Sequence, residues 1–538
     1  MAMKQLINFG KKFFLLLILF MILLQFNNCK LKFNNPKDPM SQSYLETWLW
    51  EEYLRSLCNP NLRGFVRLGT GTYKTYPYKL LKLKNGNFLV TAGVFEEVIW
   101  NGKTAGKNFS FSGTPGTDMN VIVFLVNGRS LQIEWLDYLG QLVTSSDSKD
   151  TSPITELSNG DVVVTTYVKS AVQGNPISSK SNTNSLIMVR YDGNGNRIWS
   201  TYLDKTDNSI LESRFSLVTD SLDRIHLFFT GKGVGSPIAD TVGFGEFPTM
   251  EVSSNGFNSN QEEIGWAVIS AQGVPIRQRY LPSNGNTSVH NAILGMSDSI
   301  ILSGSAEDNF TGYTGHPLPA YNYKRPVVTK LSINSFAITN ITYLGSISPS
   351  HTIGTVQEIR SGSDGIYGTG VSAGDFGTSF HPFQLYPSTT SYRNTIFSKF
   401  DWNGNLIWNQ FLGSTAIDSL EIPPTLSYIT ETSSLKVFGF SLSNGTRYTG
   451  LSIPTSGDGI NPFQRFTLTI SETNGHYQSI HYETSFNNDP PGATELLQNI
   501  VSVSEACQGR LVRLKSIIEY SSEKGILELE TKPATEEP

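Results

Sequence analysis

The chain of 538 residues carries a formal net charge of −5, with 41 Lys and Arg against 46 Asp and Glu. A nucleic-acid partner requires a basic face, so this acidic balance leads us to expect no nucleic-acid ligand. Gly (48), Pro (25), Tyr (22) and Phe (31) are abundant and only 16% of the residues are charged, which favours a turn-rich, all-β protein.

Residues 1–28 have the pattern of an export signal. Lys4, Lys11 and Lys12 form a basic start, and residues 13–24 are an unbroken apolar run. This run is too short for a membrane-spanning helix, which needs about 20 apolar residues. The segment is therefore predicted to be a secretory signal peptide.

The apolar run is followed by Leu24-Gln25-Phe26-Asn27-Asn28-Cys29. This stretch resembles a lipobox, where a bacterial lipoprotein is cut and its new N-terminal cysteine is acylated, in the relaxed form of spirochaetal lipoproteins. Asn28 stands where Gly or Ala is usual. The resemblance implies lipidation at Cys29 and a place in the cell envelope, at the outer membrane or cell surface rather than the inner membrane. The alternatives are a plain signal peptide with an incidental cysteine and an uncleaved anchor.

Residues 29–42 are polar and contain two prolines, so we expect a tether. Residues 43–57 are predicted to form a short amphipathic helix that begins with the capping box Ser43-Tyr44-Leu45-Glu46. Its apolar residues recur at helical spacing, and its polar face lacks the Lys and Arg excess of a membrane-surface helix. We therefore expect the helix to pack on the domain that follows.

From residue 62 to residue 532 the chain repeats a strand, a tight turn and a second strand. The unit is clearest in 185–204 and 394–413, where Asp192-Gly193-Asn194-Gly195-Asn196 and its counterpart separate two β-branched and aromatic runs. Gly and Asn tolerate positive φ, so the unit is predicted to be a β-hairpin. Its second strand has large side chains on both faces, such as Ile198 and Trp199, which predicts cover on both faces.

The repeat recurs with a nearly constant period. The successive spacings of its aromatic anchors are 64, 78, 63, 68 and 71 residues, and the anchors are Tyr138, Tyr202, Tyr280, Tyr343, Phe411 and Tyr482. A seventh copy at 64–70 places Arg67 71 residues before Tyr138. A second hairpin lies between anchors, for example at Asn85-Gly86, Asn159-Gly160 and Asp364-Gly365. Four strands per period and about seven periods predict an all-β fold, a seven-bladed β-propeller.

The two ends of the repeat region complement each other. Residues 497–503, 510–520 and 525–530 supply three strand-like runs without a fourth, whereas the run 64–70 has no local partners. We predict that 64–70 is the fourth strand of the last blade. This pairing would close the propeller and leave no open edge between its first and last blades.

The hairpin that ends in an aromatic residue, Leu and Gly resembles the SBBP repeat of bacterial seven-bladed β-propellers, a family common among exported and lipid-anchored proteins. The best matches are 185–204 and 394–413, with a fair match at 119–140. The resemblance covers about residues 62–530. It implies the fold and export, and it transfers no catalytic residue.

Three local patterns suggest chemistry that their context does not support. The Asp192 turn resembles the start of a calcium loop, but Leu203 stands where the bidentate Glu would be, so we expect a plain turn. Residues 370–374 match G-x-S-x-G around Ser372 but lack the strand-to-helix context of a nucleophile elbow. The histidines show no metal-ligand spacing, so we predict no metal site; they are His226, His290, His316, His351, His381, His476 and His481. We also predict no cofactor and assign no catalytic residue, although acids from different blades could converge.

The long loops are predicted to lie between the second and third strands of the blades, on the opposite side from the short turns. They comprise residues 98–118, 233–263, 305–326, 373–394 and 444–464. Aromatic side chains on such loops can form a binding surface, or can fold each loop onto its own blade. The candidate binding residues are Phe310, Tyr313, His316, Tyr321, Tyr323, Phe376, Phe380, His381, Phe383 and Tyr386.

With Cys29 lipidated, Cys58 and Cys507 are the remaining cysteines of a protein expected in an oxidising compartment. Cys58 precedes the predicted closing strand and Cys507 lies in a turn of the same blade, so we predict a disulfide between them. The alternative is two unpaired, buried thiols.

Together these patterns predict a lipid-anchored cell-envelope propeller that binds or scaffolds through its long-loop side. Its partners are expected to be the membrane, through the lipid, and an unknown protein or glycan. The alternative is an exported propeller enzyme that acts on polysaccharide or another extracellular substrate.

Overall fold

The computed structural model divides into two compact units, Met1–Asn59 and Pro60–Pro538. The described residues all belong to the second unit, so the signal peptide, Cys29, the tether and the helix predicted at 43–57 lie outside them. The described residues are 63–67, 75–100, 103–104, 106–127, 133–142, 153–168, 185–202, 211–232, 262–281, 283, 285–308, 310, 324–344, 354–362, 364–372, 394–412, 425–429, 434–441, 464–482, 501–503, 510–518 and 525–533.

Within these ranges the regular elements are all strands, and they form seven antiparallel sheets of four strands and one small hairpin. Sheet 1 contains β2 (Thr75–Lys82), β3 (Phe88–Val94), β6 (Asn120–Val126) and β7 (Ile133–Gln141). Sheet 2 contains β8 (Ile154–Glu156), β9 (Val162–Val168), β10 (Ser185–Tyr191) and β11 (Arg197–Tyr202). Sheet 3 contains β12 (Leu211–Thr219), β13 (Ile225–Lys232), β14 (Glu262–Ile269) and β15 (Pro275–Leu281). Sheet 4 contains β16 (Thr287–Leu294), β17 (Ser299–Ala306), β18 (Arg325–Ser332) and β19 (Ala337–Tyr343).

Sheet 5 contains β20 (Gly354–Ser361), β21 (Ile366–Ser372), β22 (Asn394–Phe400) and β23 (Leu406–Leu412). Sheet 6 contains β24 (Thr425–Ile429), β25 (Ser434–Ser441), β26 (Gln464–Ser471) and β27 (Tyr477–Tyr482). Sheet 7 contains β28 (Val501–Val503), β29 (Arg510–Ile518), β30 (Gly525–Pro533) and, paired antiparallel with β30, β1 (Arg63–Arg67). The small hairpin pairs β4 (Ile99–Trp100) with β5 (Lys103–Thr104). No helix among the described residues is long and apolar enough to cross a membrane.

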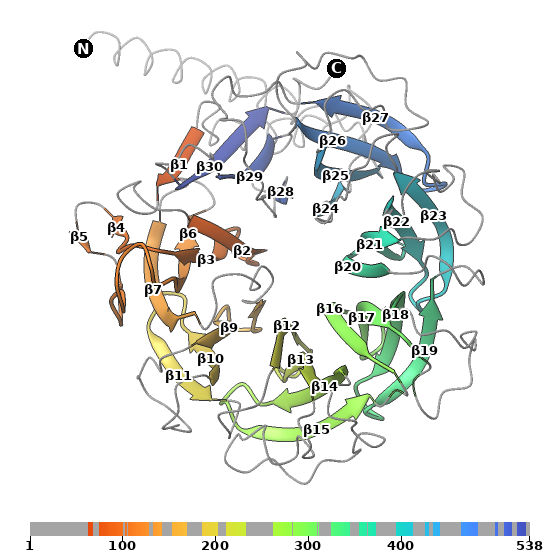
Figure 1. The fold of residues 1–538 in the computed structure, drawn as a ribbon, viewed down its shortest axis with the longest axis horizontal. Helices are drawn as coiled ribbons and strands as arrows, with labels where there is room; N and C mark the ends of the chain where they lie inside the picture. The colour runs from red at the N-terminus through yellow and green to blue at the C-terminus, as the bar shows by residue number, and fades with distance from the viewer. Residues whose placement is uncertain are drawn as a thin grey trace, which may run out of the picture. The chain divides into compact units, whose positions relative to one another are not determined.

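Within the second unit the sheets are arranged as the blades of a β-propeller. Figure 1 shows the first strands, such as β12, β16 and β20, nearest the centre and the fourth strands, such as β15, β19 and β23, at the outside. Short turns join first to second and third to fourth strands, and longer segments join second to third strands. This alternation places the two kinds of connection at opposite ends of the strands.

The core lies between successive sheets. One cluster joins Leu89 and Val123 of sheet 1 to Val164 and Ile187 of sheet 2. Three further clusters join sheets 2 and 3, sheets 3 and 4, and sheets 4 and 5 in the same way. Third strands such as β6 and β10 therefore contain nearly continuous apolar runs, because both of their faces are covered.

The structure confirms the four-strand repeat and corrects one detail. Each predicted aromatic anchor lies in the fourth strand of its sheet, and each predicted long loop joins a second strand to a third. Cover on both faces of the fourth strand is wrong, since Ile198 and Ile407 are 41% and 53% exposed, whereas Trp199 and Trp408 are 5% and 8% exposed. The fourth strand is the outermost, so a neighbouring sheet covers one face more than the other.

Candidate functional site

We call the side that carries the short turns the short-turn side; its described third-to-fourth-strand turns are 192–196, 270–274, 333–336, 401–405 and 472–476. The side that carries the second-to-third-strand loops and the connections between sheets is the long-loop side. Ion pairs occur on both sides, and the candidate functional residues are the buried charged residues of the long-loop side that have unpartnered atoms.

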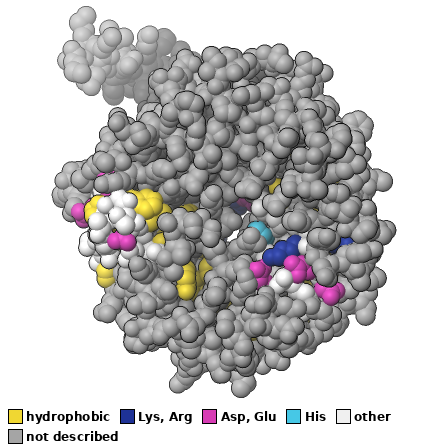
Figure 2. Space-filling model, viewed as in Figure 1, with side chains coloured by type: hydrophobic (Ala, Val, Ile, Leu, Met, Phe, Trp, Pro, Cys, Tyr) yellow, Lys and Arg dark blue, Asp and Glu magenta, His cyan; other side chains and the backbone are white. Residues whose placement is uncertain are grey.

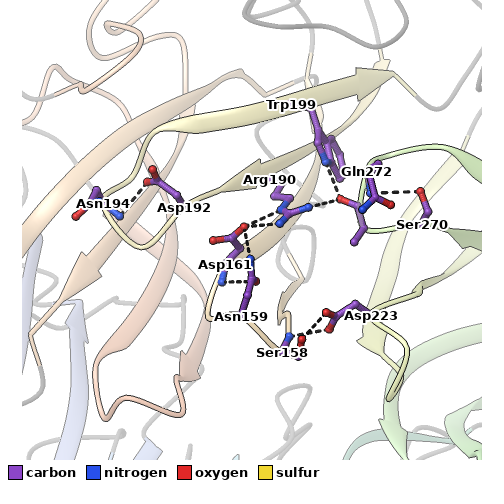
Figure 3. Close-up of polar contacts among 11 residues, drawn as sticks. Ser158, Asn159, Asp161, Arg190, Asp192, Asn194, Trp199, Asp223, Ser270 and Gln272 are labelled. Carbon is purple, nitrogen blue, oxygen red and sulfur yellow. Dashed lines mark hydrogen bonds and ion pairs between the residues drawn. The ribbon is translucent and has the colours of Figure 1, made fainter.

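On the short-turn side, a fourth-strand tryptophan contacts the next sheet. Trp199 Nε1 of sheet 2 donates to the carbonyl of Ala271 in the β14–β15 turn at 2.9 Å. Arg190 Nη1, on the neighbouring strand, donates to the same carbonyl at 2.5 Å. Arg190 Nε and Nη2 both donate to Asp161 Oδ2, at 2.9 and 2.5 Å, so the guanidinium bridges two sheets (Figure 3).

The same arrangement occurs again between sheets 5 and 6. Trp408 Nε1 and Lys399 Nζ both donate to the carbonyl of Glu472, each at 3.2 Å. Lys399 is also paired with Asp364 Oδ2 at 2.8 Å. Lys399 therefore links an aspartate of sheet 5 to a turn carbonyl of sheet 6, as Arg190 links Asp161 of sheet 2 to a turn carbonyl of sheet 3. The recurrent tryptophan of the repeat, with the cation beside it, is a contact between blades.

A fourth-strand tryptophan packs against a glycine in the short turn of the following sheet; the pairs are Trp135 with Gly195 and Trp408 with Gly475. Gly195 and Gly475 have φ values of +77° and +72°. A Cβ at Gly195 would lie 2.4 Å from the ring of Trp135, and a Cβ at Gly475 would lie 2.6 Å from the ring of Trp408. Glycine is thus required there both for the left-handed conformation and for the close approach of the indole.

The predicted long loop 98–118 does not stay on the long-loop side. Lys107 Nζ donates to the carbonyl of Asn194, and Asn108 Nδ2 donates to that of Gly195 at 3.1 Å, so the loop reaches the short turn of sheet 2. The backbone N–H of Lys107 also bonds to the carbonyl of Leu136 on the outer edge of β7. An exposed strand edge offers unpaired backbone groups, which explains why the loop runs along it.

The two suggestive turns have a structural role, and the serine of the G-x-S-x-G sequence is buried. Asp192 Oδ1 accepts the backbone N–H groups of Asn194 and Asn196, and Asp401 does the same for its own turn. Burial opposes ionisation of Asp192, but these bonds outweigh it and hold its pKa below the usual value. Ser372 is buried at the last position of β21.

His226 is 1% exposed, and both of its ring nitrogens are occupied. Trp266 Nε1 donates to Nδ1 at 3.1 Å, and Nε2 faces Asp220 Oδ2 at 3.1 Å. Burial lowers the pKa of His226, although Asp220 acts in the opposite direction. A neutral imidazole with no free nitrogen is a structural group, since a general base needs one nitrogen open to the substrate.

Of the ten predicted aromatic binding residues, the structure describes only Phe310. Its ring is 1% exposed and belongs to the core between sheets 3 and 4, and its N–H bonds to Tyr343 Oη at 3.2 Å. Phe310 is therefore a packing residue of the core, as the alternative interpretation expected of such rings. The other nine residues, and Cys29, Cys58 and Cys507, lie outside the described residues.

Charged residues gather on the long-loop side between sheets 3 and 4. Glu262, at the start of β14, is paired with Lys324 Nζ at 2.8 Å. Asn286, in the connection between these sheets, donates from Nδ2 to Glu307 Oε2 at 2.6 Å. Figure 2 shows acidic and basic side chains together in the region where Figure 1 draws β16 to β18.

Glu263, the next residue of β14, is a buried carboxyl group. It is 1% exposed, and its Oε2 atom has no hydrogen-bond partner. Burial raises its pKa to about 7, and a bond from the backbone of Ser283 opposes this shift only partly. A carboxyl group with this pKa is still partly protonated at neutral pH, a property that general acids also have.

Arg325, the first residue of β18, is a buried cation on the same side. It is 3% exposed, and its Nε and Nη2 atoms have no hydrogen-bond partner. Burial lowers its pKa. A guanidinium in this state is costly, because buried charges are normally paired.

The repeat pattern did not reveal these two residues, because they occur in single blades. They lie at different junctions: Arg325 is on the face of sheet 4 that looks toward sheet 3, whereas Glu263 shares the face of Ala267 and Ile269, which looks toward sheet 2. Glu262-Glu263 and Lys324-Arg325 nevertheless open third strands directly after long loops, where burial is expected. Charged pairs at such positions were the available signal. Among the described residues, no group of three His, Cys, Asp or Glu side chains has a geometry that would hold a metal ion.

No protein-family model matches the chain, and no curated protein matches it. Solved structures with a similar fold include a protein of unknown function from Dyadobacter fermentans, at 7% identity over 71% of this chain and 94% of that chain, with a TM-score of 0.37. An α-L-arabinofuranosidase of Fusarium graminearum matches at 10% identity over 71% and 93%, with a TM-score of 0.35. A family PL25 ulvan lyase matches at 10% identity over 88% and 98%, with a TM-score of 0.40. These similarities are too distant to bear on activity or ligand.

Proposed function

We propose that the protein is a lipid-anchored cell-envelope β-propeller that binds a protein or glycan ligand on its long-loop side. The observation that supports this role is the contrast between the two sides. The cations Arg190 and Lys399 on the short-turn side hold neighbouring sheets together, whereas Glu263 and Arg325 on the long-loop side are buried with unpartnered atoms. Uncompensated groups of this kind lower stability, so they are expected where a ligand compensates them.

The binding role is tested by shortening long loops of the full-length protein. Residues 311–323 and 374–392 are replaced separately by short Gly-Ser linkers, and residues 170–183 of sheet 2 serve as the control. Each variant is screened against a glycan array and immobilised extracellular-matrix proteins. We expect at least one ligand to be lost with the first two variants and kept by the control. Equal binding by all three variants would contradict the role.

The propeller itself is proposed to have seven blades, with β1 closing the last one. The pairing of Arg63 with Glu530 and of Arg67 with Ile526 supports this arrangement. A disulfide between Cys58 and Cys507 would join the two ends further. Deletion of residues 60–68 should then lower the unfolding temperature by many degrees, and thiol counting on denatured, unreduced protein should find neither cysteine free.

Attachment through Cys29 is tested by substitution. Cys29→Ser should move the protein from the membrane fraction to the soluble fraction, because acylation requires the thiol. Unchanged membrane partition would refute the lipid anchor and leave the binding role intact.

An exported enzyme acting on polysaccharide is the second candidate, and the pKa of Glu263 is the observation that favours it. A carboxylic acid that titrates near neutral pH is suited to general acid catalysis. Reducing-end and unsaturated-product assays on a polysaccharide panel test this candidate. Activity that Glu263→Gln abolishes would establish the enzyme, and the absence of any turnover would leave the binding role.

A further inference from the structure

We propose that Arg325 binds a single carboxylate of a hydroxylated ligand, such as a sugar acid, on the long-loop side between sheets 3 and 4. This inference rests on the proposed binding role, and it names the chemistry of the ligand. It begins with the two unpartnered atoms of Arg325, Nε and Nη2. These two nitrogens form one edge of the guanidinium and donate in parallel, which is the geometry of a bidentate carboxylate or phosphate contact.

The molecule itself shows what fills such an edge. In Arg190 the same two atoms, Nε and Nη2, donate to Asp161 Oδ2. Arg224 Nε likewise donates to Asp220 Oδ2 at 2.6 Å. Arg325 presents the same Nε and Nη2 edge as Arg190, but no carboxylate like that of Asp161 accepts from it. The missing partner is therefore a carboxylate that does not come from the described residues.

The segment that leads into Arg325 supplies no such acid either. Residues 309–323, which lead directly into Lys324 and Arg325, contain no Asp or Glu. The acids at this place in the described residues have other partners: Glu262 is paired with Lys324, and Glu307 accepts from Asn286. A ligand is then the natural source of the carboxylate.

The sheet register places Arg325 at the junction of two blades. Arg325 is opposite Ala306 on β17, and Ala306 is opposite Thr287 on β16, so the three side chains point to the same face of sheet 4. The hydroxyl of Thr287 accepts the N–H of Ile264 at 3.2 Å, which shows that this face looks toward sheet 3. Beside it, the side chain of Lys324 is 33% exposed, so the junction reaches the surface.

The charges around Arg325 select the kind of anion. The chain is acidic, with a net charge of −5, and Glu262 and Glu307 lie at the same junction, so a polyanion or a dianionic phosphate would be repelled. One guanidinium edge matches one monoanionic carboxylate. Carboxylate side chains only accept hydrogen bonds, and the hydroxyl groups of a sugar supply donors for them. A sugar acid satisfies both requirements.

The test uses the full-length protein and two probes, methyl glucuronide and methyl galacturonide, each with its uncharged methyl ester. Titration calorimetry or ligand-observed NMR measures binding to the wild type, Arg325→Lys and Arg325→Met. We expect at least one acid to bind more tightly than its ester, and Arg325→Met to lose roughly 10- to 100-fold of that affinity, as for a charge-assisted bidentate contact. Arg325→Lys should retain part of the affinity because it keeps the charge without the edge.

Thermal unfolding without ligand gives a second readout. Arg325→Met should leave the unfolding temperature unchanged or raise it, because it removes an uncompensated buried charge. The matched control Arg190→Met should lower it, since that change leaves Asp161 without its partner. A clear drop for Arg325→Met would mean that Arg325 already has its partner in the fold, and would overturn the proposal.

The remaining outcomes separate the inference from the binding role. Equal binding of acid and ester, binding of neither acid, or unchanged acid binding by Arg325→Met overturns the carboxylate site. Tighter binding of a peptide with a free C-terminal carboxylate than of both sugar acids overturns the sugar-acid assignment. In each case loss of screened ligands on loop shortening would still support the binding role, whereas no binding in any assay would refute both.

Discussion

Arg190 and Arg325 show how the two sides of this molecule differ. Each arginine lies on the third strand of its sheet, and each is largely buried. The guanidinium of Arg190 is paired with Asp161 and bonds to the next blade, whereas Nε and Nη2 of Arg325 have no partner. Arg190 thus joins two blades on the short-turn side. On the long-loop side Lys324 and Glu262 also join two blades, but Arg325 is left without a partner.

The comparison separates residues that make the fold from residues that are available for function. Trp135, Trp199 and Trp408 recur with the repeat, and each donates to a carbonyl of the following blade. Glu263 and Arg325 occur in single blades. Substitutions on the short-turn side should therefore act on stability, and those on the long-loop side should act on ligand binding or on the pH dependence.

The largest expected effect is that of Trp408→Ala. This change removes a buried indole and its bond to Glu472, and should lower the free energy of unfolding by about 3–5 kcal/mol. The matched control is the neighbouring residue of the same strand, Ile407→Ala, where the side chain is 53% exposed and about 0.5 kcal/mol is expected. Urea unfolding measures both variants. Equal losses would break the distinction between the covered and the open face of the fourth strand.

Gly195→Ala tests the close approach between blades. The new methyl group would meet the ring of Trp135 and also occupy a left-handed φ of +77°, so we expect a loss of about 3 kcal/mol. Gly86→Ala has a similar φ of +86° and nothing within 4 Å of the new Cβ, so about 1 kcal/mol is expected. The difference between the two variants in thermal unfolding measures the steric contribution of the indole. No difference would mean that the contact is not tight.

Glu263 predicts a loss of stability with rising pH. Its folded pKa of about 7 lies above the unfolded value near 4.5, so the folded state keeps a proton that the unfolded state releases. The stabilising contribution is full below about pH 4.5 and decreases as the pH rises through 7, by up to about 3 kcal/mol. The free energy of unfolding of the wild type and of Glu263→Gln, measured from pH 4 to 8, isolates this term. Parallel curves would show that Glu263 is ionised in the fold.

Much of the fold could be predicted because it is repeated. The Gly-Asn turns and the aromatic anchors fixed the hairpins, and Tyr138, Tyr280 and Phe411 lie in the predicted fourth strands. The purpose of the recurrent tryptophan was not predictable, since its partner carbonyl lies in the next blade at a sequence separation of about 60 to 70 residues. A periodic pattern shows which residues recur, but not which backbone atom they contact.

The candidate site was less predictable, for two physical reasons. Aromatic content suggested Phe310 as a surface residue, but a long loop needs rings to pack it onto its own blade, and Phe310 is buried there. Glu263 and Arg325 owe their character to burial and to missing partners, and these are three-dimensional properties that the residue type does not reveal.

The smallest effect on stability is expected in the short turn of Asp192, where two substitutions of the same residue can be compared. Asp192 Oδ1 accepts two backbone N–H groups and Oδ2 accepts Asn196 Nδ2, so Asp192→Ala should cost about 1 kcal/mol. Asp192→Asn keeps one acceptor oxygen and should cost about half as much.

The bonds hold the pKa of Asp192 below its usual value. The contribution of Asp192 to the free energy of unfolding is therefore present above the unfolded pKa and decreases as the pH falls through the folded pKa. Unfolding of both variants at pH 7 and pH 3 tests this, and Asp192→Ala should cost more than Asp192→Asn at pH 7. A loss as large as that of Trp408→Ala would mean that the turn, rather than the tryptophan contact, dominates the junction between blades.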